Sequence, residues 1–164
     1  MGYQCNGCGE WHEDLPFSYH APAPQFWSDE RFDEDGCELG DEQCVIGGDS
    51  FFVRALIQIP VVDGDENFEW GVWVSLSESN FDLVSETWDT EGREEMDPMF
   101  GWLSTELPVY DPSTLDLKTM LHTQPVGLRP LVELEPTDHP LAVEQRDGIT
   151  VARVQELAEI LLHG

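Results

Sequence analysis

The stretch FFVRALIQIPVVDGDENFEWGVWVSL, from Phe51 to Leu76, decides the fold of this chain. Apolar residues alternate along both of its halves, at Phe51, Val53, Ala55, Ile57, Ile59 and Val61 and then at Phe68, Trp70, Val72, Val74 and Leu76. Alternation with a period of two is typical of strands with one buried face, and the acidic residues 63–67 are typical of a turn. The stretch predicts an antiparallel hairpin with strands at 51–62 and 68–76, the first bent at Pro60. Trp73, on the opposite face, is expected to be exposed.

The remaining sequence adds helices and further strands. Asn80 is the expected N-cap of a helix over 80–88, and Asp138 and Thr150 are expected to cap two C-terminal helices. Further strands are predicted over 100–107, 118–123 and 128–134. Together these elements predict an α+β fold with a mainly antiparallel sheet of about four to six strands. The C-terminal helices are expected to pack on one face, and a loop-rich, Cys-containing N-terminal segment is expected at an edge.

The length of 164 residues fits a single domain over 1–164, in which 1–50 form the Cys-anchored segment and 51–164 form the sheet and the C-terminal helices. No apolar stretch has the length of a signal peptide core or a transmembrane helix, so we expect a cytoplasmic protein. Cysteines in that compartment usually remain thiols or bind metal.

The charge is strongly one-sided, with 34 Asp and Glu residues against 7 Lys and Arg residues and a formal net charge of −27. Nucleic acid and anionic membranes bind clusters of basic residues, so neither is expected as a partner. Such acidity suits solvation in a salty cytoplasm, and it also suits binding to a basic protein partner. Both explanations of the acidity stay open at the level of sequence. The sequence does not indicate the oligomeric state.

The best-defined chemical motif is Cys5-Asn6-Gly7-Cys8-Gly9. Two cysteines at this spacing on a tight turn can bind one tetrahedral zinc ion, and the glycines permit the backbone curvature that aims both thiolates at it. The expected ligands of a structural Zn²⁺ site are Cys5, Cys8, Cys44 and His12. Cys37 in place of His12 stays open, and His20 is a further candidate. Free thiols and a redox pair are alternatives for the same motif.

Catalytic motifs are scarce in this chain. Glu135 and His139 can form an acid and base pair in a pocket that Arg129 and Trp73 also line, but Asp138-His139-Pro140 is better explained as the start of a helix. The sequence has no nucleophile elbow, no phosphate-binding glycine loop and no His-Glu-x-x-His motif. It therefore favours a protein that is not an enzyme.

Several segments of the chain form a recognisable set: Cys5-x2-Cys8-Gly9-x2-His12, Cys44-Val45-Ile46, Phe51 to Arg54, Ile59-Pro60-Val61, Trp70 to Leu76, Phe100 to Ser104, Gly127 to Leu134 and His139 to Ala142. This set resembles the bacterial DUF2199 family over nearly the whole chain. The family is described as a domain of unknown function, so the resemblance implies no activity and no catalytic residue. It favours Cys44 over Cys37 as a metal ligand, because Cys44 lies within a family-like segment.

Three functions follow as expectations. The first is a non-enzymatic binding or accessory protein with a structural zinc site. The second is a small-ligand-binding protein or an enzyme with a pocket beside the sheet. The third is an acidic inhibitor or immunity-type protein that binds a basic partner.

Overall fold

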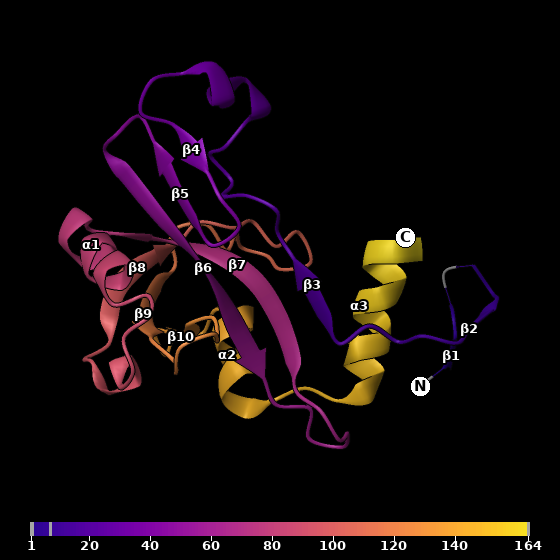
Figure 1. Cartoon of the computed structure of the whole chain (residues 1–164). Coiled ribbons are helices and arrows are strands. Elements are labelled where there is room, and N and C mark those ends of the chain that lie inside the picture. Colours follow the sequence, from indigo (N-terminus) through magenta and orange to yellow (C-terminus); the bar gives the residue numbers. More distant parts are fainter. Residues whose placement is uncertain (1, 7, 164) are drawn as a thin grey trace.

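The computed structural model describes residues 2–6 and 8–163, and it has an α+β architecture built around one eight-stranded sheet (Figure 1). The strands lie in the order β3-β7-β8-β9-β10-β6-β5-β4, and an additional pairing of β6 with β7 closes five of them into a barrel. Their bounds are β3 Ser18–His20, β4 Glu38–Leu39, β5 Gln43–Ile46, β6 Ser50–Ile59, β7 Phe68–Leu76, β8 Met99–Leu103, β9 Lys118–His122 and β10 Leu131–Leu134. The α+β class is confirmed, and the sheet has more strands than the sequence predicts.

The hairpin of β6 and β7 organises this sheet. Its antiparallel register runs from Phe51 opposite Leu76 to Ile59 opposite Phe68, which confirms the predicted pairing. The first strand ends at Ile59 because Pro60 has no amide to donate to a ladder. Along its outer edge, from the N-terminal to the C-terminal end of the strand, β6 pairs with β5 and then with β10. In the same direction, the outer edge of β7 pairs with β3 and then with β8.

Two of these pairings are parallel, namely β10 with β6 and β3 with β7. The sheet is therefore mixed, which corrects in part the expectation of a mainly antiparallel sheet. The N-terminal segment differs from the prediction as well, because β3, β4 and β5 are integral strands of the sheet. Of the strands in the described residues, only β1 Tyr3–Gln4 and β2 Trp11–His12 stand apart, as a small separate hairpin, and a 3-10 turn at Asp29–Asp33 follows β3.

Buried side chains form two clusters on opposite sides of the β6–β7 hairpin. The main core includes the alternate residues Val53, Ala55, Ile57 and Ile59 of β6, and it extends to residues of α2, α3 and the N-terminal hairpin. The second, which we term the outer cluster, consists of Cys37, Cys44, Ile46, Phe52 and Trp73. Trp73 is 0% exposed, so the expectation that it faces solvent is wrong. Ala21, Trp27 and Leu39, from the segment between β3 and β5, pack over this cluster and bury the indole.

The helices are α1 Glu78–Glu86, α2 Pro140–Asp147 and α3 Val151–His163, and a second 3-10 turn lies at Arg93–Glu95. The expected caps Asn80 and Asp138 are wrong, since the helices are capped by Ser77, three residues earlier, and by His139, one residue later. The Ser77 hydroxyl accepts from the Asn80 amide, and the His139 ring accepts from the Leu141 amide. Thr150 caps α3 as predicted, because its hydroxyl accepts from the Arg153 amide at 3.2 Å. Among the described residues, no helix has both the length and the apolar character needed to cross a membrane.

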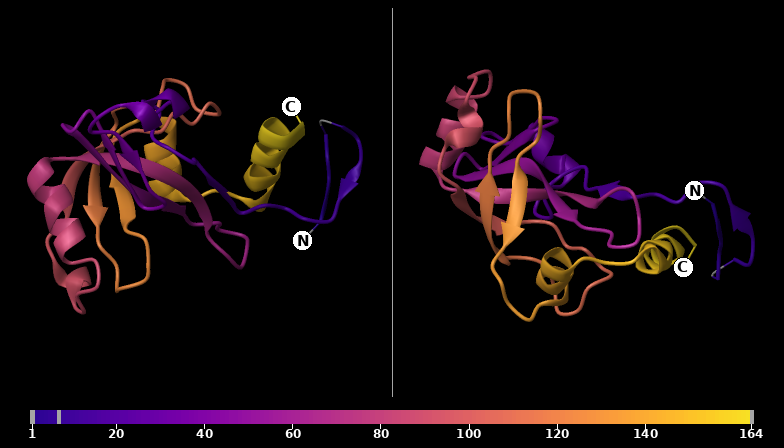
Figure 2. Two further views of the ribbon diagram at one scale, coloured as in Figure 1. Left: turned by 45° about the horizontal axis from the view of Figure 1, so that its top comes forward. Right: turned by 90° about the horizontal axis from the view of Figure 1, so that it is seen from below.

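The two C-terminal helices lie at different places, α2 at the barrel and α3 beside β3 and the turn between β6 and β7 (Figure 2). Helix α2 lies against β6 and β10, where the Gln145 side chain accepts from the Leu134 amide and donates to the Val132 carbonyl. Helix α3 buries Val154, Leu157 and Ala158 in the main core. The β1–β2 hairpin lies beside α3 in both views of Figure 2. The first and last elements of the chain therefore meet at one end of the molecule.

Candidate metal centre

The Cys-x2-Cys motif lies in the turn of the β1–β2 hairpin. Tyr3 pairs with His12 and Gln4 with Trp11, so the two strands run antiparallel into and out of the motif. The Cys5 amide donates to the Glu10 carbonyl at 2.9 Å, and the Gly9 amide donates to the Cys5 carbonyl at 2.9 Å. Gly9 has a φ of 78°, a left-handed conformation that glycine adopts without strain. Local backbone geometry therefore presents Cys5 and Cys8 on one side of the turn.

Three potential ligand atoms converge there. The Sγ atoms of Cys5 and Cys8 and a ring nitrogen of His12 all lie within 4.8 Å of one another. The Cys8 Sγ is 3.1 Å from His12 Nε2, and the Cys8 amide donates to Cys5 Sγ at 3.4 Å. With zinc–ligand bonds of about 2.0–2.3 Å, ligand atoms of a tetrahedral site lie roughly 3.5 Å apart, so shifts of about 1 Å or less bring the three atoms to that spacing.

The hairpin is attached to α3 by polar contacts as well as by packing. Gln155 donates to the Gln4 carbonyl at 2.8 Å, and Asn6 donates to a Glu159 carboxylate oxygen at 3.2 Å. Tyr3 and Cys5 are buried in the main core, and burial, followed by the thiols of Cys5 and Cys8, raises the pKa of Tyr3. Sequence reasoning does not identify the two α3 residues, because they look like ordinary members of the solvent-exposed side of a helix.

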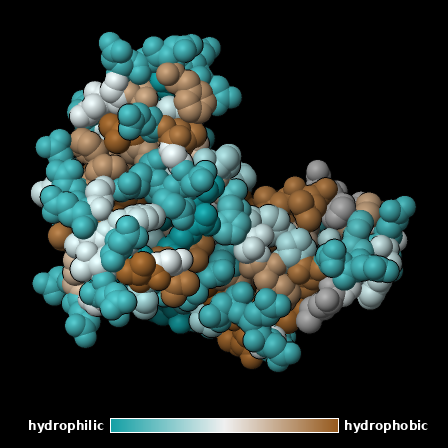
Figure 3. All heavy atoms as spheres, viewed as in Figure 1, coloured by the Kyte–Doolittle hydropathy of each residue, from teal (hydrophilic) through white to brown (hydrophobic). Residues whose placement is uncertain are grey.

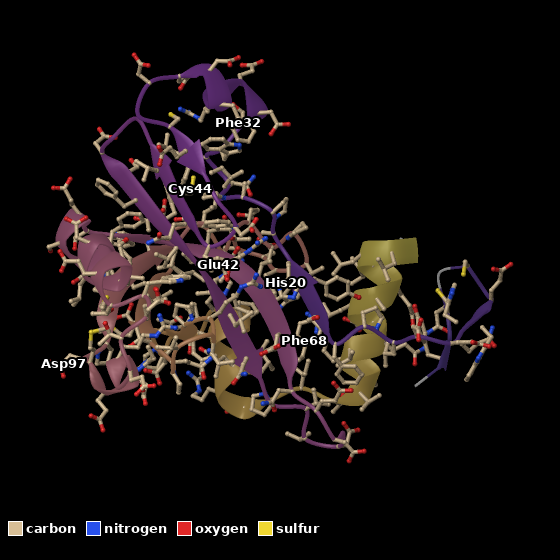
Figure 4. The ribbon with its side chains drawn as sticks, viewed as in Figure 1. His20, Phe32, Glu42, Cys44, Phe68 and Asp97 are labelled. Atoms are coloured by element: carbon tan, nitrogen blue, oxygen red, sulfur yellow. The ribbon has the colours of Figure 1, made fainter. Side chains whose placement is uncertain are left out.

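The structure does not bring Cys44 to these three groups. Cys44 lies on β5, is 1% exposed and belongs to the outer cluster together with Cys37. Figure 4 shows it in the upper part of the molecule, whereas Figure 1 places β1 and β2 at the right-hand end. Burial, followed by the neighbouring Cys37, raises the pKa of the Cys44 thiol to about 12. Cys44 is therefore an inert thiol of the core. It lies far from Cys5 and Cys8 because the chain crosses the molecule between the Cys-x2-Cys motif and β5.

His20 and Cys37, the other two candidate ligands, also lie elsewhere. His20 is on β3 beside β7, and Cys37 accepts a hydrogen bond from the Gly47 amide at 3.2 Å. The described residues thus supply Cys5, Cys8 and His12 as the cluster that can hold a metal ion.

The suggested acid and base pair of Glu135 and His139 does not form. The His139 ring caps α2 through Nδ1, and its Nε2 lies 2.8 Å from the Pro112 carbonyl oxygen. Both ring nitrogens therefore have backbone partners. This agrees with the structural explanation of His139 as part of a helix start.

Comparison with known proteins identifies the family of this chain. No curated protein and no solved structure matches the chain. A family model, described as an uncharacterized protein conserved in bacteria (DUF2199), matches residues 4–149. The matched residues include the three potential ligands Cys5, Cys8 and His12, and they end before α3. The chain belongs to the DUF2199 family.

Proposed function

We propose that this protein is a non-enzymatic binding or accessory protein whose N-terminal hairpin is held by a structural zinc ion on Cys5, Cys8 and His12. The convergence of these three ligand atoms carries the proposal. Strands of two residues each bury too little surface to hold a hairpin together in water. A zinc ion would link the turn to β2 and so stabilise the surface that packs on α3.

Three protein ligands leave a fourth position, which is also the pattern of many catalytic zinc sites. We favour a structural role because the site belongs to a hairpin docked through Tyr3 and Cys5 on the main core. The exposed Cys8 faces solvent, so water or a group from a partner can complete the coordination.

Zinc content tests this site directly. Protein purified without chelator is expected to hold about one zinc ion per chain, because a tetrahedral site of this type binds a single ion. The Cys8→Ser variant is expected to lose nearly all of it, since a serine hydroxyl is a poor zinc ligand. Metal analysis gives the stoichiometry, and Co²⁺ substitution gives the thiolate absorption of a Cys-ligated tetrahedral ion.

The Cys37→Ser variant is the matched control, because Cys37 lies in the outer cluster and should leave zinc content unchanged. Metal-free wild-type protein, or equal zinc content in the Cys8 and Cys37 variants, would contradict the site.

The binding role rests on an exposed aromatic face, defined by Phe26, Phe100 and Trp102. Their exposed fractions are 47%, 42% and 40%. Phe100 and Trp102 form an edge-to-face pair with ring centroids 5.0 Å apart on β8. Trp102 and Phe26 line one hollow of about 250 Å³, and Phe100 lines another of about 220 Å³. Exposed aromatics beside surface hollows are typical of a protein interface.

The charge around the aromatic face indicates the chemistry of the partner. The two hollows are lined by the carboxylates Asp49, Asp116, Glu133 and Glu135 and by a single cation, Lys118. With the net charge of −27, this rim favours a basic protein that inserts apolar side chains between the aromatic rings. Such binding is steered by charge and weakens as salt increases.

The partner is sought by affinity capture from lysate and then measured as a purified protein. We expect a basic protein whose dissociation constant rises at least about tenfold in a Trp102→Ser variant, since a buried aromatic anchor contributes about 2 kcal/mol or more. Raising the salt from about 50 to about 300 mM is expected to weaken binding further. The matched control is Leu128→Ser, at an exposed apolar residue outside this face. Equal losses in both variants, or a partner without basic character, would refute the proposed face.

A further inference from the structure

Arg54, in the middle of β6, has a guanidinium whose charge is poorly compensated. Its NH1 group donates to the Asp41 carbonyl at 2.9 Å and its NH2 group to the Ala21 carbonyl at 2.7 Å. Its Nε is buried and has no hydrogen-bond partner among the described residues. The guanidinium lies over the Trp73 ring, 5.2 Å from the centroid. All of its hydrogen bonds thus go to neutral carbonyl groups, and none goes to a carboxylate.

A second guanidinium, that of Arg129, is joined to Arg54 through Glu42. Arg129 Nε donates to both carboxylate oxygens of Glu42, at 2.7 and 3.0 Å. The Glu42 carbonyl accepts from the Arg54 amide at 2.8 Å. The two terminal amino groups of Arg129 make no hydrogen bond within the described part of the chain, and its side chain is 33% exposed. The outer edge of this guanidinium is therefore available to a ligand.

His20 completes this group from a third strand. It pairs with Gly71 of β7, and Gly71 pairs with Leu56 of β6. A Cβ atom at Gly71 would lie 2.1 Å from His20 Nδ1, so the missing side chain makes room for the imidazole. The Ala21 carbonyl next to His20 is a partner of Arg54, and the Pro130 carbonyl next to Arg129 accepts from the Leu56 amide at 2.9 Å. Backbone pairing thus brings His20, Arg54 and Arg129 to one surface.

We term His20, Arg54 and Arg129 the basic face. Figure 4 shows His20 and Glu42 over the middle of β6 and β7, and Figure 3 shows hydrophilic residues gathered there. Three carboxylates contribute to this region: Glu42 is bound by Arg129, Glu69 accepts from Gln58 at 2.9 Å, and Asp41 is near enough to raise the pKa of Arg54. Two of the 7 Lys and Arg residues of a chain with a net charge of −27 thus meet at one place. A partly buried cation normally has an anionic partner, and Arg54 has none hydrogen-bonded to it.

We propose that the basic face binds a small oxyanion, the carboxylate or phosphate group of a ligand, between His20, Arg54 and Arg129. The free edge of Arg129 offers two parallel N–H donors, the geometry that matches a carboxylate or phosphate. The ring of His20 makes no hydrogen bond to the described residues and supplies a further donor. The bound anion compensates the charge of Arg54.

The electrostatics of Arg54 and His20 agree with this assignment. Burial and the nearby Arg129 lower the pKa of Arg54, although Glu42 and Asp41 act in the opposite direction. Burial, Arg129 and Arg54 lower the pKa of His20, and Glu69 opposes them. Both basic groups are thus harder to keep charged than in water, and an anion bound there would relieve this cost.

Titration followed by NMR tests the basic face. Inorganic phosphate and acetate are added separately, and the ring signals of His20 and the Nε–H signals of Arg54 and Arg129 are observed. We expect saturable chemical-shift changes with at least one of the two anions. The anion that binds with the higher affinity shows whether the natural ligand carries a phosphate or a carboxylate group. Arg129→Gln is expected to weaken binding about tenfold or more, because it removes a charged bidentate donor.

Two further variants make the result decisive. Arg146→Gln, which removes an exposed arginine of α2, should bind as the wild-type protein does and controls for net charge. His20→Gln keeps both guanidiniums and should weaken binding less than Arg129→Gln, so it serves as the test if the latter does not fold. Shifts that never saturate, or equal affinity in the Arg129, His20 and Arg146 variants, would overturn the proposal.

Discussion

The Trp73→Ala variant will have a free energy of unfolding about 3–5 kcal/mol below that of the wild-type protein. Trp73 is 0% exposed and packs in the outer cluster with Phe52, Cys44 and Cys37. Its truncation leaves a cavity between β6, β7 and the segment that covers them. It also removes the hydrogen bond from the indole Nε1 to the Ala21 carbonyl, which is 3.0 Å long, and the ring under the Arg54 guanidinium.

Urea denaturation measures this loss as a shift of the midpoint at an unchanged slope. Trp102→Ala is the matched control, since Trp102 is 40% exposed on the aromatic face and its loss should cost less than about 1 kcal/mol. Similar midpoints for the two variants would show that the outer cluster contributes little to stability.

The contrast between Trp73 and its neighbours shows what the pattern of a strand can predict. The alternation from Phe51 to Leu76 predicts the hairpin and its register, because one face of each strand must be buried. It cannot indicate that residues 21–39 return to cover the other face, since that depends on contacts between segments distant in sequence. Trp73 is therefore assigned to the wrong environment although its strand is predicted correctly.

The closure of the barrel cannot be predicted from the sequence for a related reason. The β6–β10 pairing is parallel, and a single residue pair, Leu131 with Leu56, defines it. The short strand of four residues from Leu131 to Leu134 carries no signal for its neighbour or direction. Long amphipathic strands and capped helices are predictable from local periodicity, whereas the order of short strands is set by tertiary packing.

The two candidate sites differ in the same way. Cys5, Cys8 and His12 are close in sequence, so their spacing predicts a cluster that the fold does bring together. Cys44 is distant from these residues in sequence. Its position near the start of the sheet does not bring it to the β1–β2 hairpin. His20, Arg54 and Arg129 come from β3, β6 and the loop before β10 and have no shared local motif, so only the structure reveals the basic face.

The Arg93→Met variant is expected to lose about 3–5 kcal/mol of unfolding free energy, because it leaves several buried carbonyl groups without a donor. Arg93 is 7% exposed. Its guanidinium donates to the carbonyls of Gln124, Trp88 and Leu128 at 2.8, 2.9 and 3.0 Å, with a fourth bond to Pro125 at 3.3 Å. One side chain thus ties the turn before β8 to the loop between β9 and β10.

Chemical denaturation of two further variants separates charge from geometry. Arg93→Lys keeps the positive charge, but an ammonium group at the end of a shorter stem cannot reach carbonyls on two loops, so we expect it to recover less than half of the loss. Arg146→Met removes an arginine of α2 whose side chain is 46% exposed and should change stability by less than about 0.5 kcal/mol. If Arg93→Met proves as stable as Arg146→Met, the carbonyls must find other donors, and the loop between β9 and β10 does not depend on Arg93. If Arg93→Lys is as stable as wild type, the charge alone holds the two loops together.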